Sequence, residues 1–91
     1  MDVATVGSLV PERAVVVTSG IHGVEGFAGS AVQTEWLRRL GQGKAAVPDR
    51  VRLVFAHALN PYGFAWIRRA NECNVDLNRN FLLAGDSYSG I

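Results

Sequence analysis

The feature that most constrains the fold is an apolar, largely β-branched stretch, Ala-Val-Val-Val-Thr at residues 14–18, which runs into a glycine-rich turn. Because it shows no polar alternation, this stretch is typical of a strand buried on both faces of a parallel sheet. A helical pattern follows the turn, and a second apolar stretch, residues 53–56, continues to Leu59. Strand, helix and strand within about 45 residues predict a βαβ unit.

The helical pattern begins near Phe27, and its apolar residues recur every four positions as a stripe along one face of the predicted helix. Gln33 does not lie on that face. The stripe consists of Ala28, Val32, Trp36 and Leu40. Glycines at positions 41 and 43 are expected to end the helix. Further along, residues 60–63 are typical of a turn and residues 71–80 of a polar loop. Residues 64–70 fit either a short helix or an irregular segment.

One βαβ unit offers a single helix to a sheet that has two faces to cover. We therefore expect the α/β class, as a fragment of a mixed, mainly parallel sheet flanked by helices. Residues 1–91 would form a single partial domain, with residues 82–91 as a weakly structured tail. A piece of this size is marginal alone. Its incomplete sheet would have an exposed edge that allows self-association.

Charge and composition exclude several classes of protein. Nine Lys and Arg against eight Asp and Glu give a net charge of +1, so no nucleic acid or anionic membrane is expected as a partner. No apolar run approaches the roughly 18–20 residues that span a bilayer, and residues 1–15 lack the apolar core of a signal peptide. A single cysteine excludes an internal disulfide framework. These features predict a cytoplasmic protein.

His22 and Glu25 are the strongest candidates for chemistry. They lie three residues apart on the turn that follows the first strand, at the sheet edge where open α/β folds place their ligands. Side chains at this spacing on a turn entering a helix point to one side. An imidazole nitrogen and a carboxylate can there bind one Zn²⁺. The alternative is a histidine that is hydrogen-bonded within the loop, beside a solvated glutamate.

Other polar residues each allow two interpretations. Arg68–Arg69 and Asn78–Arg79 either hold an anionic substrate, since guanidinium pairs well with carboxylate, or form a solvated basic face. His57, near the end of the second strand, either completes a metal site or is a hydrogen-bonded structural histidine. Cys73 is either a soft ligand or reactive thiol, or an incidental free cysteine.

The glycine-rich turn also raises the alternative of a nucleotide-binding module, because it follows a strand and opens a helix. Its glycines fall at positions 20, 23 and 26, which is neither the GxGxxG pattern nor a Gly-Lys-Ser/Thr loop. Glu25 would repel a phosphate. This alternative is therefore disfavoured.

Three motifs, in order along residues 15–81, resemble those of the M14-type zinc carboxypeptidases. Gly-Ile-His-Gly-Val-Glu at 20–25 is similar to their His-x-x-Glu zinc motif, and Asn-Pro-Tyr-Gly-Phe at 60–64 to their Asn-Pro-Asp-Gly-Phe turn. Arg-Ala-Asn at 69–71 and Asn-Val-Asp-Leu-Asn-Arg-Asn-Phe at 74–81 resemble their Arg-x-Asn and Asp-Leu-Asn-Arg-Asn-aromatic segments. Residues 57–69 look closest to a bacterial branch catalogued as a domain of unknown function. Aspartoacylase-like deacylases share a related core.

The resemblance implies a role for each matching residue. His22 and Glu25 would be two of three ligands to Zn²⁺. Arg69 would be the catalytic arginine that polarises the scissile carbonyl, with Arg68 in its place if the register slips by one. The substrate's terminal carboxylate would be held by Asn78 and Arg79. The implied protein is a zinc-dependent metallocarboxypeptidase-like hydrolase acting on a peptide or acyl-amino-acid substrate with a free carboxylate.

The match departs from the family pattern in two respects. Tyr62 stands where the family has aspartate, which leaves the substrate open. The family's third zinc ligand, a histidine, and its general-base glutamate would lie downstream of Ile91, so residues 1–91 alone are expected to be inactive. Two alternatives therefore stay beside the peptidase: an aspartoacylase-like deacylase of acyl amino acids, and a non-catalytic binding fragment.

Overall fold

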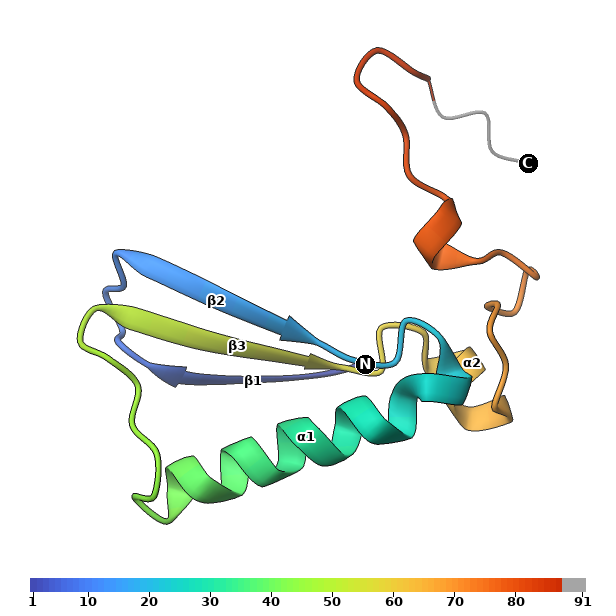
Figure 1. Cartoon of the computed structure of the whole chain (residues 1–91). Helices are drawn as coiled ribbons and strands as arrows, with labels where there is room; N and C mark the ends of the chain where they lie inside the picture. The colour runs from blue at the N-terminus through green and yellow to red at the C-terminus, as the bar shows by residue number, and fades with distance from the viewer. Residues whose placement is uncertain (88–91) are drawn as a thin grey trace.

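A computed structural model describes residues 1–87 and shows a small α/β fold, with one long helix against a three-stranded mixed sheet (Figure 1). In chain order the elements are β1 (Asp2–Gly7), β2 (Arg13–Thr18), α1 (Gly23–Gly41), β3 (Val51–His57), α2 (Pro61–Trp66) and the 3₁₀ turn η1 (Leu77–Arg79). The expected fold class is confirmed. Residues 88–91 of the expected tail lie outside the described residues. Within residues 1–87, no helix combines the length and apolarity that crossing a membrane requires.

The sheet has the strand order β1-β3-β2. β2 and β3 run parallel, with Val15 opposite Leu53, which confirms the predicted βαβ unit of β2, α1 and β3. β1 pairs antiparallel with β3 and was not predicted. Its sequence, Asp-Val-Ala-Thr-Val-Gly, is short and lacks a clear apolar-polar alternation, so nothing in its pattern marks it as a strand.

β2 is an edge strand in the described part of the chain, so the prediction that it is buried on both faces is wrong here. It pairs with β3 alone, and α1 lies against one face of the sheet (Figure 1). Val15 is 45% exposed and Val16 is 61% exposed. The β-branched run thus identified the strand correctly but not its surroundings.

α1 begins at Gly23, four residues before the expected start, and ends at Gly41 as predicted. The expected apolar stripe faces the sheet only in part. Trp36 packs edge-to-face against Phe55 of β3, but Val32 is 63% exposed, whereas Gln33 is only 4% exposed. The Gln33 amide donates hydrogen bonds to the Val17 and Ala56 carbonyls, at 2.9 and 3.3 Å. These carbonyls lie where β2 and β3 end, so the buried amide gains hydrogen-bond partners in the sheet that an apolar side chain could not use.

The expected turn at residues 60–63 is the start of a helix. Asn60 is the N-cap of α2, because its side-chain oxygen accepts a hydrogen bond from the Gly63 amide at 2.8 Å. Pro61 occupies the first helical position, where its missing N–H costs nothing. α2 ends at Trp66, because Ile67 adopts a left-handed backbone conformation with φ of 52°. The segment left open by the sequence, residues 64–70, is therefore helical only in its first part.

The ion pairs of Glu35 on the exposed side of α1 predict a measurable pH dependence. Arg38 and Arg39 both hydrogen-bond the Glu35 carboxylate, and they lower its pKa from 4.5 to about 2. A carboxyl whose pKa is depressed in the folded state stabilises the fold above its unfolded pKa, and that contribution is lost as the pH falls through the folded value. Thermal unfolding should therefore lose this stability between about pH 4.5 and pH 2.

The matched variant is Glu35→Gln, whose unfolding temperature should approach that of the wild type as the pH falls over this range. The wild-type advantage should also shrink in high salt, since exposed pairs are screened. A carboxyl resonance of Glu35 that titrates at its ordinary value would contradict the expectation.

Candidate metal centre

The candidate site lies where the parallel strands β2 and β3 end and their following turns meet. The Leu59 amide donates to the Ser19 carbonyl at 3.0 Å, and the Asn60 amide donates to the Gly20 carbonyl at 2.9 Å. Gly20 has a φ of 68°, which favours glycine, and this turn directs the chain into α1. These bonds hold the His22 turn beside the start of α2 (Figure 1).

His22 is the N-cap residue of α1, yet its side chain does not cap the helix. The residue is 6% exposed, and its Nε2 atom lies 2.9 Å from Oδ1 of Asp76, 54 residues further along the chain. A carboxylate accepts hydrogen bonds, so in neutral His22 the proton sits on Nε2. The other nitrogen, Nδ1, then carries a free lone pair of the kind that a metal needs.

That free nitrogen faces Glu25. His22 Nδ1 and Glu25 Oε2 are 3.6 Å apart, across the i,i+3 spacing of the first turn of α1. The Glu25 side chain is 73% exposed, and an acidic residue in the first helical turn is also favoured by the helix dipole. The pair therefore combines a fixed imidazole with a carboxylate that is free to adjust its position.

Asp76 links His22 to the first arginine site. Its Oδ1 atom also accepts a hydrogen bond from the Asn78 amide at 2.9 Å, and its Oδ2 atom accepts one from Arg69 Nε at 2.7 Å. The hydrogen bonds from His22 and Arg69 hold the pKa of Asp76 well below its usual range. The Asp76 carboxylate is therefore ionised at neutral pH, which allows it to accept hydrogen bonds from both His22 and Arg69.

The structure brings Arg69, and not Arg68, to this carboxylate. Arg69 uses Nε for Asp76, and within residues 1–87 its two terminal amino groups form no hydrogen bond. Arg68 instead points to Tyr62, with Nη1 and the phenolic oxygen 3.5 Å apart. Trp66 lies beside the Tyr62 ring at a centroid distance of 6.4 Å.

The second predicted anion-binding pair is exposed. Asn78 and Arg79 belong to η1, which Asp76 caps through the Asn78 amide. The Arg79 guanidinium donates to the Asn78 carbonyl at 2.9 Å and, within the described residues, forms no ion pair. Both side chains are therefore accessible to a ligand in solution.

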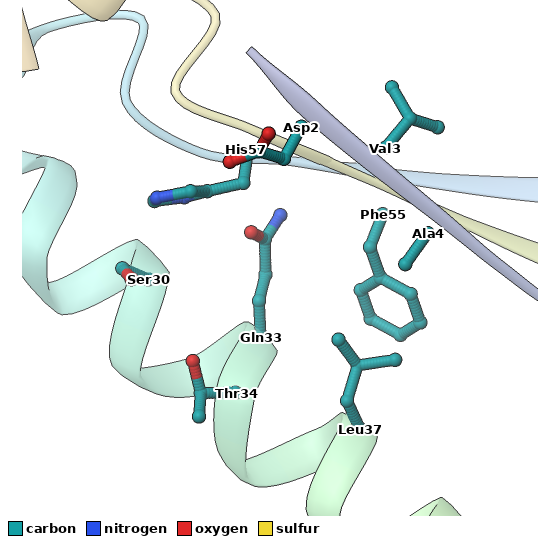
Figure 2. Close-up of a pocket in the computed structure, with 9 residues that line it drawn as sticks. All are labelled: Asp2, Val3, Ala4, Ser30, Gln33, Thr34, Leu37, Phe55 and His57. Atoms are coloured by element: carbon teal, nitrogen blue, oxygen red, sulfur yellow. The ribbon is translucent and has the colours of Figure 1, made fainter.

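His57 belongs to a different cluster from His22. Its Nδ1 atom lies 3.0 Å from the Ser19 hydroxyl, which donates to Gln33 Oε1 at 2.9 Å. Figure 2 shows His57 with Asp2 and Gln33 around a pocket of about 200 Å³ between α1 and the sheet. These contacts favour the structural interpretation of His57. Cys73 is a free, exposed cysteine in the loop before Asp76.

Sequence reasoning named His22, Glu25 and Arg69 but missed Asp76, which joins His22 to Arg69. A metal-binding histidine almost always donates its second N–H to a carboxylate or carbonyl. That rule predicts a partner for His22, but nothing in the sequence singles out Asp76 among the other carboxylates. Among residues 1–87, no three His, Cys, Asp or Glu side chains are grouped to hold a metal ion. The described residues thus offer two candidate ligands, His22 Nδ1 and the Glu25 carboxylate.

The fold and the site together define a small α/β protein with an imidazole-carboxylate pair at the carboxyl edge of parallel strands. The chain belongs to the family described as "Protein of unknown function (DUF2817)", whose model matches residues 1–89. Comparisons with the curated proteins and with the solved structures found no match.

Proposed function

We propose that this chain forms the zinc-site part of a metallocarboxypeptidase-like hydrolase that cleaves an amide bond next to a free carboxylate. One observation carries the proposal. His22 is fixed by Asp76 at Nε2, and its Nδ1 faces Glu25 at 3.6 Å. A buried histidine with one nitrogen on a carboxylate and the other beside a second carboxylate is the arrangement that protein zinc ligands adopt.

The donor set fits Zn²⁺, which accepts imidazole nitrogen and carboxylate oxygen. When bound, zinc would lower the pKa of a water molecule to about 7 and make it a nucleophile at neutral pH. His22 and Glu25 would hold the ion, and Asp76 would fix the tautomer and orientation of His22. Catalytic zinc sites use three protein ligands, so we propose that the third ligand and the general base come from outside residues 1–87.

Arg69 would act on the carbonyl of the substrate. Its bond to Asp76 through Nε fixes the plane of the guanidinium and leaves both terminal amino groups available. Donors held in place before the reaction stabilise the negative charge that develops on a carbonyl oxygen. Arg79 and Asn78 are exposed and would hold the substrate's terminal carboxylate, since arginine pairs with carboxylate in a bidentate way.

Asp76→Asn tests the proposed metal site directly. Asparagine keeps the shape of the side chain but removes the charge that holds the proton on His22 Nε2. Loss of such a supporting carboxylate typically weakens metal binding by about 10- to 100-fold. We expect a drop of this size in zinc affinity, measured by competition with a chromophoric chelator.

Glu72→Gln is the matched control, because it removes the same charge from an exposed residue in the same loop. Its zinc affinity should equal that of the wild type. Equal affinities for wild type, Asp76→Asn and Glu72→Gln would show that Asp76 does not support a metal ligand.

A further inference from the structure

Asn60 is the most deeply buried polar residue of the described chain, although the proposed chemistry does not use it. It is 1% exposed, and both of its backbone groups and both ends of its side chain are hydrogen-bonded. The backbone amide donates to the Gly20 carbonyl, and the backbone carbonyl accepts from the Phe64 amide, each at 2.9 Å. The side-chain oxygen caps α2 at Gly63, and the side-chain nitrogen donates to the Arg69 carbonyl at 3.4 Å.

These partners belong to the two halves of the candidate site. Gly20 opens the turn that carries His22, and Arg69 is the residue that reaches Asp76. Asn60 therefore bridges the segment with the proposed metal ligands and the segment with the proposed catalytic arginine.

A second contact joins the same two segments. The Gly23 amide donates to the Arg68 carbonyl at 2.9 Å, and the start of α1 lies directly against α2 at Gly63. A Cβ atom on Gly63 would also collide with the Asn60 side chain. The backbone of α2, which Asn60 caps, thus packs directly against the backbone at the start of α1, next to His22.

We propose that Asn60 is a positioning residue, which holds the Arg68–Arg69 backbone against the His22 turn so that Arg69 reaches Asp76. The position requires an acceptor for the Gly63 amide and a donor for the Arg69 carbonyl. Asparagine supplies both, whereas an ionised aspartate supplies acceptors only. The link to catalysis rests on the proposed function, but the positioning of Arg69 does not.

The test compares wild type with Asn60→Asp and Asn60→Ser by hydrogen exchange in ¹⁵N NMR spectra. Both replacements keep an oxygen that can cap Gly63, and neither can donate to the Arg69 carbonyl as asparagine does. Asn80→Asp is the control, because Asn80 is exposed and its side chain forms no hydrogen bond within the described residues.

In both Asn60 variants we expect the Gly63 amide to keep its protection. The Arg69 Nε–H should exchange about fivefold faster, the factor that corresponds to one ordinary hydrogen bond. If Asn60→Asp does not fold because it buries a charge, Asn60→Ser decides the question. Unchanged exchange at Arg69 Nε–H, together with a lower unfolding temperature, would show a purely structural role and overturn the proposal.

A zinc titration of the same samples separates this inference from the proposed function. Two ligands are expected to bind zinc weakly, so the titration is carried to a large excess of zinc. A wild-type protein in which His22 then shows no response to zinc would refute the metal site. The exchange rates at Gly63 and Arg69 would still decide whether Asn60 positions the arginine.

Discussion

His22→Ala is expected to abolish the weak zinc binding that the pair of His22 and Glu25 provides. The substitution removes the only imidazole of the proposed pair and leaves Glu25, whose side chain is 73% exposed, as a single carboxylate. A lone solvated carboxylate has no charge or geometry that distinguishes it from other surface carboxylates. Removal of a supporting carboxylate lowers metal affinity by about 10- to 100-fold. The loss of zinc affinity in His22→Ala should be larger than that. Equilibrium dialysis with metal analysis, or a chelator competition, measures it.

Two variants make this result specific. His57→Ala removes the other histidine and should leave zinc binding intact, because His57 is held by Ser19 in a separate cluster. Glu25→Gln should weaken binding, because it removes the second ligand. If His57→Ala abolishes binding while His22→Ala does not, the proposed site is wrong and the metal binds at the pocket of Figure 2.

Gly23→Ala is expected to destabilise the fold strongly. A Cβ atom at this position would collide with the carbonyl group of Gly63 and approach the Phe64 amide, and both are backbone groups that cannot rotate away. Overpacking of this kind typically costs about 1–3 kcal/mol. In a chain of this size, each kcal/mol lowers the unfolding temperature by about 4–8 °C. Thermal unfolding followed by circular dichroism measures the change.

Gly41→Ala is the matched control at the other end of α1. Apart from the adjoining residues and backbone of α1 itself, no atom lies within 4 Å of the Cβ that it would add, and alanine favours the helix. This variant should be neutral, or more stable by up to about 1 kcal/mol. If Gly23→Ala and Gly41→Ala unfold at the same temperature, α1 and α2 are not in the close contact that the structure shows.

The sequence predicted the part of the fold whose local signals agree with one another. The β-branched run, the glycines after the helix and the second apolar run each indicate one element, and they identified β2, α1 and β3. The missed strand, β1, has no distinct pattern. The face of α1 against the sheet was predicted correctly at Trp36, which contacts Phe55, and wrongly at Val32 and Gln33, because hydrophobic periodicity assumes an apolar contact. Gln33 enters that contact because it bonds to two carbonyls that only the folded sheet brings together.

In the candidate site, too, the sequence predicted the residues that are close together in the chain and missed the contact between distant ones. His22 and Glu25 are three residues apart, so local geometry was enough to propose the pair. Arg69 was named by its position in a motif, but its contact with Asp76 depends on how the chain returns after α2. Asp76 was missed because its partners lie 54 and 7 residues away. No periodicity in a single sequence reports such a meeting.

The bond between His22 and Asp76 joins two residues that are synthesised far apart along the chain. β2, α1 and β3 are complete by residue 57, and a chain that has emerged only to that point already carries both proposed ligands. Its imidazole, however, has no partner that decides which nitrogen holds the proton. The proton is fixed on Nε2 only when the Asp76 carboxylate contacts His22. A chain cut in the loop around Cys73 would lack Asp76 and would therefore present His22 as a mixture of tautomers.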